Sequence, residues 1–434
     1  MTTDKIIALI NTIDPIFLDK KNRQKLYIAV QKNTPQSDLT RANFLADQII
    51  EYKIVKKVST PILDTFDIIT KTDLTRIMHQ KKIKYFLLPH RPSSDLKKWA
   101  KKNKFFLIAP PADLQTKFEN KLFFDALLKK KEIPSPTSIR SQAELGVLAN
   151  EKLVFQQAEG YGLFGTKFYS NAKQLLAKEK FNPKTTLIRQ YLPGIPIGVS
   201  VALDGQGNRF YSAYRRQCYI NENGFPKIFL GVQWLPKNFF SPKTNLAIEK
   251  CLNQLTDILI SYKFVGMANF DIQISQGQPY VLECNPRLSS ATQHVFSLKE
   301  LTGYNDIWNF YLNSILKIKN SSHQIAKVPN SKFSGSLLDI DLDEKTLIKK
   351  VSPLGVYNFS QNKIKYLGLK IEKLWQNKNN FLLFHETPKA NITDQNFTLA
   401  TIISNFAVFD LKTGSLNEKG RILYKYFRKE ALEK

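Results

Sequence analysis

The first hundred positions of the chain alternate short apolar runs with segments in which apolar residues recur at helical spacing. The apolar runs typical of strands are Leu26–Val30, Ile54–Val58, Tyr85–Pro89 and Phe105–Ala109. The segments with helical spacing are Ala42–Tyr52, Asp73–Lys82 and Ser94–Lys102. Strands that alternate with helices predict a small doubly wound α/β domain in this part of the chain.

The pattern changes after this region, and strands become more frequent. The elements predicted there are one helix at Leu114–Lys131, strands at Leu153–Gln157 and Leu187–Leu192, and a long helix at Leu246–Tyr262. After Gly194 the chain is mostly β apart from this long helix, and from about residue 327 it carries few clear signals. We therefore expect four parts: an N-terminal α/β domain, a linker helix with a small subdomain, a larger α+β subdomain, and an appendage of unknown role. Their predicted ranges are 1–117, 118–193, 194–326 and 327–434.

Composition narrows the protein class. Apolar residues make up 43% of the 434 residues and aromatic residues 12%, which favours a folded globular protein over a disordered one. The sequence contains no apolar run of about 18 residues and no recognisable secretory signal, so we expect no membrane partner. The three cysteines, Cys218, Cys251 and Cys284, form neither a disulfide framework nor a metal motif. We expect a cytoplasmic location.

The net charge of +27 favours a nucleic acid or another anionic surface as a partner. The basic residues are mostly lysines, however, and they are spread from Lys5 to Lys434. Small clusters at Lys97–Lys104 and Lys129–Lys131 lie in segments with helical spacing, which predicts solvated helix faces. A basic Lys-rich composition therefore explains the charge better than nucleic-acid binding, which is kept as an alternative function.

The most informative stretch is Phe264–Ser290, which has the pattern of two strands joined by a tight turn around Gly277. If Gly277 is the centre of a three-residue loop, Asp271 and Glu283 lie directly opposite one another, with their side chains on the same face. Asn285 follows Glu283 by two positions and shares that face. Two opposed carboxylates repel each other, and a bound cation would remove the repulsion.

Carboxylate and amide oxygens, without His or Cys, suit Mg²⁺, and Mn²⁺ can take the same ligands. Since Mg²⁺ usually binds few protein ligands together with nucleotide phosphates, the expected cofactors are Mg²⁺ and ATP. Arg287 follows at once and can hold a transferring phosphoryl group. We therefore predict Asp271, Glu283 and Asn285 as metal ligands and Arg287 as a catalytic residue.

This segment resembles the metal-binding end of the ATP-grasp superfamily. The resemblance rests on Asp271, followed twelve positions later by Glu283-Cys284-Asn285-Pro286-Arg287, and its tail is most similar to that of carbamoyl-phosphate synthetases and their relatives. It implies a fold of two α+β subdomains after the N-terminal domain. It also implies Mg²⁺ ions held between the two acids, the amide and the ATP phosphates. It extends over roughly residues 20 to 320.

Other parts of the chain match this family in the expected order. The resemblance implies that Lys121 approaches the ATP phosphates and that a lid loop with Gly160, Gly162 and Gly165 covers them. Ile133–Pro136 resembles a conserved proline segment of the family. Gln190, Tyr191 and Leu192 match the hinge whose backbone holds adenine.

Two departures from the family pattern affect the expected activity. Gln156 and Gln157 stand where the family usually has a second lysine, and Gly198-Val199-Ser200 stands where many members have a glutamate. Glutamine cannot neutralise a phosphate, so nucleotide affinity or orientation is expected to differ. An ATP-binding regulator with weak or no turnover is therefore a second alternative.

The resemblance implies an ATP-dependent ligase that joins a carboxylate to an amine through an acyl-phosphate. The expected substrates are small molecules, such as amino acids or peptide-like acids and amines. Arg215 and Arg216 lie on a predicted strand that leads to the same face, and one of them could bind the substrate carboxylate. The identity of the substrates, the oligomeric state and the role of the last hundred residues cannot be predicted from the sequence.

Overall fold

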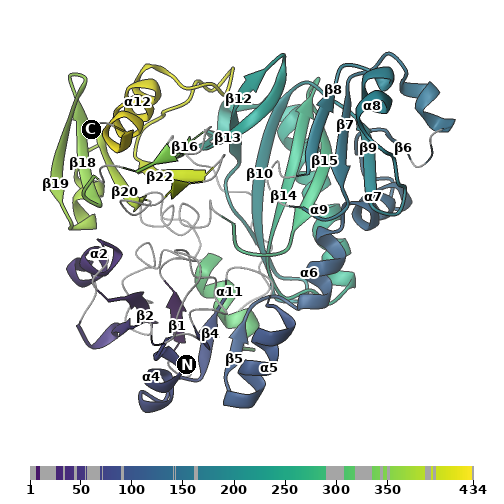
Figure 1. Ribbon diagram of the computed structural model, residues 1–434. Coiled ribbons are helices and arrows are strands. Elements are labelled where there is room, and N and C mark those ends of the chain that lie inside the picture. Colours follow the sequence, from purple (N-terminus) through teal and green to yellow (C-terminus); the bar gives the residue numbers. More distant parts are fainter. Residues whose placement is uncertain are drawn as a thin grey trace.

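The computed structural model describes residues 6–9, 26–32, 35–43, 46–53, 55, 69–70, 72–88, 92–139, 141, 143–160, 165–289, 307–317, 335–342, 346–348, 352–386, 392–393 and 397–432. It has three larger sheets (Figure 1). No helix in these ranges is long and apolar enough to cross a membrane. The α/β class is confirmed, with an additional large antiparallel sheet.

The first sheet is parallel, with strand order β3-β2-β1-β4-β5. Its strands are β1 (Ile6–Leu9), β2 (Leu26–Gln31), β3 (Ile49–Tyr52), β4 (Tyr85–Leu87) and β5 (Phe106–Ile108). The helices around it are α2 (Pro35–Asn43), α4 (Leu74–Gln80) and α5 (Ser94–Asn103), with a 3-10 turn at Ala46–Gln48. Ser93 caps α5, because its hydroxyl accepts a hydrogen bond from the Leu96 amide. This is the doubly wound arrangement that the alternating pattern predicts.

The helix predicted at Ala42–Tyr52 is wrong. The chain leaves α2 at Asn43, and Ile49–Tyr52 forms β3, which pairs in parallel with β2. Along β3 the residues alternate between half-buried and buried, as in a strand on a sheet surface. Pairing with β2 overrides the weak helical pattern of this segment. Of the strand predicted at Ile54–Val58, only Val55 lies within the described residues.

The single helix predicted at Leu114–Lys131 is also wrong, because Asn120 divides it into α6 (Ala112–Glu119) and α7 (Lys121–Lys130). Asn120 has extended backbone angles, and its side chain accepts a hydrogen bond from the Phe123 amide. The asparagine therefore ends one helix and caps the next. This break places Lys121 at the first position of α7.

A second sheet follows, with order β6-β9-β7-β8 and antiparallel pairing. Its strands are β6 (Ser138–Ile139), β7 (Leu153–Gln157), β8 (Thr166–Tyr169) and β9 (Thr186–Gln190), with helix α8 (Ala172–Lys178) and a 3-10 helix at Ala143–Leu148. Figure 1 shows it beside the largest sheet, on the side where β15 (Gln278–Asn285) lies. The space between these two sheets contains the site described below.

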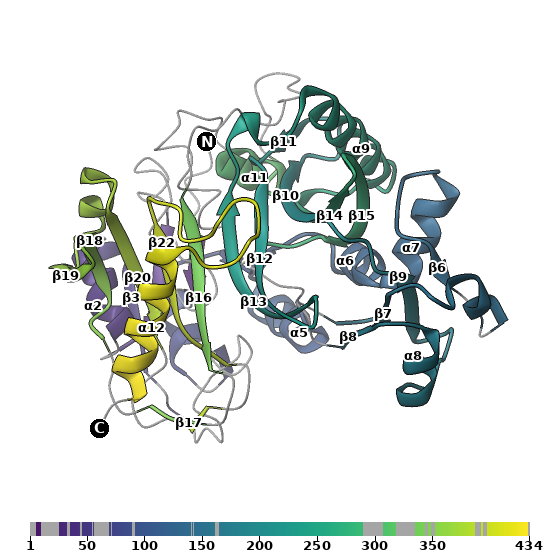
Figure 2. The ribbon, with the colours of Figure 1, turned by 90° about the horizontal axis from the view of Figure 1, so that it is seen from above.

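The largest sheet is antiparallel, in the order β15-β14-β10-β12-β13-β16-β22-β20-β18-β19, with β11 paired to β10. Its first strands are β10 (Ile195–Leu203), β11 (Arg209–Tyr211), β12 (Arg215–Glu222), β13 (Phe225–Trp234), β14 (Gly266–Ser275) and β15 (Gln278–Asn285). Its later strands are β16 (Ser336–Leu342), β18 (Gly355–Ser360), β19 (Lys363–Gly368), β20 (Asn380–Glu386) and β22 (Phe397–Ser404). A separate two-stranded sheet pairs β17 (Thr346–Leu347) with β21 (Ile392–Thr393). Figure 2 shows the large sheet from above.

Helix α9 (Pro242–Ser261) supports the strands that carry the site. Its buried residues include Ile248, Leu252, Leu255 and Leu259, which recur at helical spacing and pack in one core with residues of β10, β14 and β15. Ser241 caps the helix by accepting a hydrogen bond from the Thr244 amide. This packing supports the β14–β15 hairpin on the face opposite the two acids.

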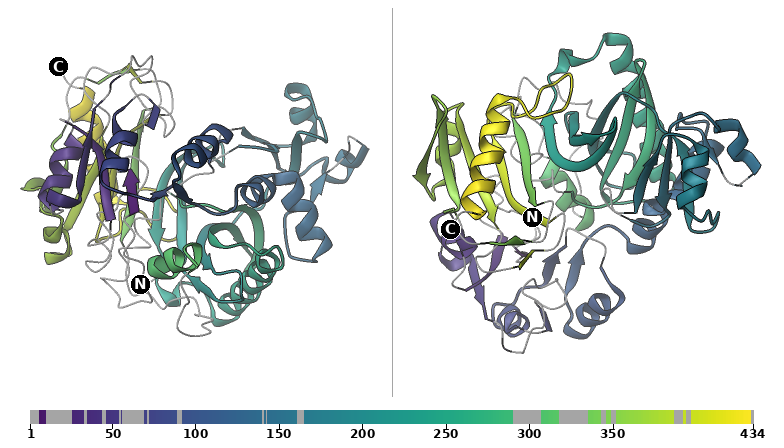
Figure 3. Two further views of the ribbon diagram at one scale, coloured as in Figure 1. Left: turned by 90° about the horizontal axis from the view of Figure 1, so that it is seen from below. Right: turned by 45° about the horizontal axis from the view of Figure 1, so that its top comes forward.

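The last hundred residues are part of the largest sheet, which the sequence did not predict. Strand β13 pairs with β16, and the C-terminal strands extend the sheet from there, covered by the 3-10 helix Ile371–Gln376 and α12 (Glu418–Leu432). Helix α11 (Ile307–Ile315) packs instead against β10 and β14. They also meet the N-terminal domain (Figure 3): the Asn43 side chain donates to the carbonyl of Leu369 at 2.8 Å. The four-part division by residue number remains a prediction.

Asp339 on β16 leads to a prediction about pH and stability. Burial, with the nearby charge of Asp341, raises the pKa of Asp339 from 3.8 to about 7. The folded state therefore binds this proton more tightly than the unfolded state, and stability is lost as the pH rises from about 4 to about 7. We expect Asp339→Asn to reduce the pH dependence of the free energy of unfolding by up to about 1.4 kcal/mol per pH unit. Urea unfolding of the wild type and the variant at pH 5 and pH 8 measures this difference. Equal losses in the two proteins would contradict the assignment.

Candidate functional site

The β14–β15 hairpin brings Asp271 and Glu283 opposite each other, as expected, but by a different route. Its loop has two residues, since Ser275 pairs with Gln278 and both Gln276 and Gly277 have positive φ. That register alone would place Asp271 out of step with Glu283. The ladder shifts between Ile272, which pairs with Val281, and Asp271, so that Leu282 is an extra residue in a β-bulge. The bulge restores the opposition of the two carboxylates.

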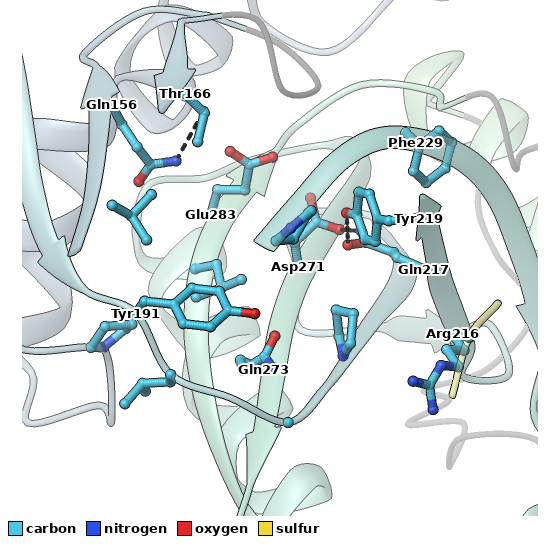
Figure 4. Close-up of a pocket in the computed structure, with 18 of the residues that line it drawn as sticks. Gln156, Thr166, Tyr191, Arg216, Gln217, Tyr219, Phe229, Asp271, Gln273 and Glu283 are labelled. Atoms are coloured by element: carbon cyan, nitrogen blue, oxygen red, sulfur yellow. Dashed lines mark hydrogen bonds between the residues drawn. The ribbon is translucent and has the colours of Figure 1, made fainter. Parts of the chain in front are cut away.

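The amides of Asn285 and Gln217 hold the two carboxylates. Asn285 donates to Asp271 Oδ2 at 3.1 Å and to Glu283 Oε1 at 3.0 Å, so its NH₂ group lies between the two acids. Gln217 on β12 donates to Asp271 Oδ1 at 2.5 Å and accepts from the Tyr219 hydroxyl at 2.9 Å. Figure 4 shows Gln217 and Tyr219 beside Asp271. The sequence analysis missed both residues.

The two acids have opposite pKa shifts. Burial raises the pKa of Asp271 well above its ordinary value, and the charge of Glu283 and a hydrogen bond with it act in the same direction. Burial also acts to raise the pKa of Glu283, but the charge of Lys121 and hydrogen bonds from Asp271 and Asn285 outweigh it, so this pKa is lowered. Without a cation, the pair therefore favours one negative charge.

Lys121 lies next to Glu283, where the family resemblance places a phosphate-binding lysine. Its Nζ is 3.5 Å from Glu283 Oε2 and donates to the carbonyl of Gly160 at 3.0 Å. Its backbone amide donates to the carbonyl of Ala158 at 2.9 Å. The first glycine of the predicted lid loop, Gly160, is therefore in direct contact with the Lys121 side chain. Gly160 and Gly165 are described, whereas Gly162 lies outside the described residues.

Gln156 and Gln157 separate onto the two faces of β7. Gln156 lines the cavity described below, and its amide is 3.5 Å from the Thr166 hydroxyl. Gln157 is exposed and packs near Gly165, which has φ +76°. Of the two glutamines, only Gln156 therefore lines the cavity.

Arg189 on β9 fixes the bulge, although nothing in the sequence indicated it. Its Nη1 donates to the carbonyl of Leu282, the bulged residue, at 2.7 Å, and its Nη2 is 3.4 Å from Asp125 Oδ1 on α7. Arg189 pairs with Val154 across β9 and β7, so it is on the same face as Gln156. A buried cation thus joins the second sheet to the carboxylate hairpin.

Arg287 lies beyond β15, and the adjacent chain holds it in place. Its Nε donates to Glu119 Oε1 at 3.0 Å, and its backbone amide donates to the carbonyl of Asn285 at 2.8 Å. Asn269, on the same face as Asp271, donates to the carbonyl of Arg287 at 2.5 Å. The guanidinium is thereby placed at the end of the carboxylate row.

Arg215 and Arg216 begin β12 and are both buried. Burial lowers the pKa of Arg215 to about 10, against the opposing charge of Asp271, so the side chain stays charged at neutral pH. Arg216 donates to the carbonyl of Leu411, and its guanidinium packs on Gly414 in the C-terminal part. In Figure 4, Arg216 lies apart from the group of Asp271, Gln217 and Tyr219.

Most of the predicted residues line one cavity of about 410 Å³ between the second sheet and the largest sheet, whereas Lys121, Gln157, Gly160 and Gly165 are not in its lining. Those that line it are Gln156, Gln190, Tyr191, Leu192, Arg215, Arg216, Asp271, Glu283, Asn285 and Arg287. Apolar and aromatic side chains, including Val154, Phe168 and Leu282, line it near Tyr191 and Leu192. Thr413 and Gly414 complete a wall from the C-terminal part. The lining thus combines apolar and aromatic side chains with charged ones.

One family model and several solved structures are similar to this chain. The family model of an ATP-grasp domain matches residues 118–291. No curated protein matches the chain.

Several solved structures share the fold at low sequence identity. The biotin carboxylase domain of Hydrogenobacter thermophilus 2-oxoglutarate carboxylase, with MgADP and bicarbonate, has a TM-score of 0.61 and 11% identity and covers 93% of this chain and 86% of that one. L-amino acid ligase from Bacillus licheniformis has a TM-score of 0.59 and 16% identity over 99% and 98% of the two chains. N5-carboxyaminoimidazole ribonucleotide synthetase from Thermotoga maritima has a TM-score of 0.54 and 15% identity over 98% of each.

Proposed function

Because the chain contains an ATP-grasp domain, we propose that it is an ATP-dependent ligase that joins a carboxylate to an amine through an acyl-phosphate. The observation that carries this proposal is the row of Asp271, Glu283 and Asn285 in one cavity with Arg287. An ordinary hairpin gives no reason for two partly buried, opposed acids. Such a pair is costly unless a cation joins it.

The donor set fits Mg²⁺. Asp271 and Glu283 offer carboxylate oxygens, and the raised pKa of Asp271 is the effect that a bound cation would reverse. The Asn285 NH₂ group lies between the two acids, so this amide must turn to present its oxygen to a metal. Bound Mg²⁺ would neutralise charge on the ATP phosphates. Two carboxylates and one amide leave room for those phosphates as further ligands.

The remaining cavity suits a nucleotide. The apolar side chains of the lining, such as Leu192 and Phe168, can enclose adenine, and Gln190, Tyr191 and Leu192 line the cavity beside them. Lys121 lies next to Glu283 and can move from Gly160 and Glu283 to a phosphate. Gly160, Gly162 and Gly165 belong to the proposed lid loop, where backbone amides can approach the anion.

In the proposed reaction, a carboxylate oxygen of the first substrate attacks the γ-phosphorus of ATP, an O–P bond forms, and the bond to ADP breaks. Arg287 then holds the phosphoryl oxygens of the acyl-phosphate through its guanidinium. The amine attacks the acyl carbon, phosphate leaves, and the amine proton goes to solvent. Positioning and charge neutralisation are the contributions of this chain.

Release of ADP tests the proposal. Purified protein with ATP and Mg²⁺ is assayed with amino acids, short peptides and other small acids, singly and in pairs with amines. We expect one acid and amine pair to stimulate ADP release and to give a product with the mass of the condensed pair. ATP hydrolysis that no pair of substrates changes would count against the ligase.

Gln156, where the family usually has a lysine, favours one second candidate, an ATP-binding regulator with little turnover. Its amide provides no positive charge for a phosphate. If the phosphates lie on this face, Gln156→Lys is expected to tighten MgATP binding by about 5- to 20-fold. Gln157→Lys is the matched control, since that side chain is exposed on the opposite face. Titration with a fluorescent ATP analogue measures both. Equal effects of the two variants would contradict the assignment of this face.

A further inference from the structure

Arg215, at the start of β12, is buried beside Gly198 on β10, where any larger residue would crowd its guanidinium. It pairs across β12 and β10 with Gly198, and a side-chain carbon on Gly198 would lie 3.0 Å from Arg215 Nε and 3.1 Å from its Cζ. Trp234, its partner on β13, lies 6.0 Å from the guanidinium on the ring face. Only 3% of the residue is exposed. The guanidinium therefore fills the place of the missing side chain at Gly198.

Neutral groups alone hold this guanidinium. Its Nη1 donates to the Ser200 hydroxyl at 3.0 Å and to Ser212 at 3.5 Å, and its Nη2 donates to Asn269 Oδ1 at 3.0 Å. Within the described part of the chain, no carboxylate lies within ion-pair distance of Arg215. Burying a charge without a counterion is destabilising. An anion supplied by a ligand would remove this cost.

Two of the three other arginines that line the cavity have a carboxylate partner. Arg287 pairs with Glu119 at 3.0 Å, and Arg189 pairs with Asp125 at 3.4 Å. Arg216 donates instead to the carbonyl of Leu411 at 2.7 Å, and burial lowers its pKa against the opposing charges of Cys218 and Asp410. Arg215 and Arg216 are thus the cations of the cavity lining without a carboxylate at ion-pair distance among the described residues, and Arg215 is the one on the face of Asp271.

The position of Arg215 relative to the metal row is set by β10. Gly198 on β10 pairs with Arg215 on one side and with Asp271 on the other, so the side chains of Arg215 and Asp271 lie on the same face of the sheet. Because the residue between them is a glycine, no side chain separates the two. Asn269 accepts from Arg215 and donates to the carbonyl of Arg287. Arg215 therefore faces the space between Asp271 and the Arg287 segment.

From this arrangement we propose that Arg215 binds the carboxylate that ATP phosphorylates. The proposal rests on the ligase function above and names its first substrate class: a planar oxyanion with two oxygens, which a guanidinium recognises with parallel hydrogen bonds. An organic acid and bicarbonate both present this group. One of the two oxygens that Arg215 holds would attack the γ-phosphorus, and the bonds formed and broken are those of the first step above.

Binding measured without turnover tests the proposal. Protein saturated with MgADP is titrated by calorimetry with bicarbonate and with each common L-amino acid, and amino-acid amides serve as controls that lack the carboxylate. We expect at least one carboxylate to bind and its amide not to bind. Arg215→Met should weaken that binding by about 10- to 100-fold, and Arg215→Lys by less, because a lysine keeps the charge but not the fork.

Arg216→Met is the matched comparison, since it removes the next buried arginine of the same strand. We expect it to change carboxylate affinity by less than about threefold, while MgADP affinity shows that each variant is folded. Equal weakening by both variants, equal binding of acids and amides, or no carboxylate binding to the MgADP complex would overturn the proposal. Failure of the wild type to bind MgADP would be seen first, and it would remove the ligase function as well.

Discussion

Replacement of Glu283 by Ala or Gln is expected to lower magnesium-dependent ADP release by at least about 100-fold. Glu283 is the acid of the pair whose pKa is lowered, so it carries the negative charge that a cation meets first. Both variants remove that charge, and Gln keeps the shape and the hydrogen-bonding capacity toward Asn285. The protein should remain folded, since the substitution also removes the repulsion with Asp271.

The measurement is ADP release against Mg²⁺ concentration, together with direct Mn²⁺ binding by electron paramagnetic resonance. Glu372→Ala is the control, because Glu372 is an exposed acid on the 3-10 helix Ile371–Gln376. If Glu283→Gln keeps a tenth or more of the metal-stimulated rate while Glu372→Ala behaves as wild type, the metal assignment is contradicted. If Mn²⁺ binding falls in parallel with the rate, the assignment is supported.

The second large effect concerns the attachment of the C-terminal strands. Gly231 on β13 has φ +129°, and a side-chain carbon there would overlap the carbonyl oxygen of Leu337 on β16. Gly231→Ala therefore combines an unfavourable backbone conformation with a clash against a fixed backbone. We expect the free energy of unfolding to fall by about 3 kcal/mol.

Gly146→Ala is the matched control, since nothing lies within 4 Å of a side-chain carbon at that position. We expect it to change stability by less than about 1 kcal/mol. Urea unfolding, followed by tryptophan fluorescence, measures both variants, and Trp234 lies on β13 itself. Equal stability of the two variants would contradict close pairing of β13 with β16. A loss of carboxylate affinity in Gly231→Ala would connect the C-terminal strands to the site.

Much of the candidate site was recognisable in advance because it lies within one hairpin. Asp271, Glu283 and Asn285 are close in sequence, and the period of a strand decides which side chains share a face. The opposition of the two acids was predicted correctly although the predicted loop was wrong, since the bulge at Leu282 offsets the shorter turn. Local patterns do not reveal a bulge that a distant arginine, Arg189, stabilises.

The residues that the sequence analysis missed come from other elements. Gln217 reaches Asp271 from β12, Tyr219 donates a hydrogen bond to Gln217, and Asn269 links Arg215 to the Arg287 segment. As isolated residues in a sequence, a glutamine, a tyrosine and an asparagine carry no signal of function. Only their meeting across strands distant in sequence gives them a role.

By itself, the sequence determined the α/β class, strands β2, β4 and β5 of the N-terminal sheet and the carboxylate hairpin, because each depends on periodicity or on a local motif. Tertiary structure alone decided that Ile49–Tyr52 is a strand, that Asn120 breaks a helix, and that the last hundred residues extend the largest sheet. It also decided which arginine faces the carboxylates, since Arg215 and Arg216 are adjacent in sequence but have different partners. These features depend on pairing and burial between segments far apart in the chain, and the free energy of such contacts is not encoded in any short stretch.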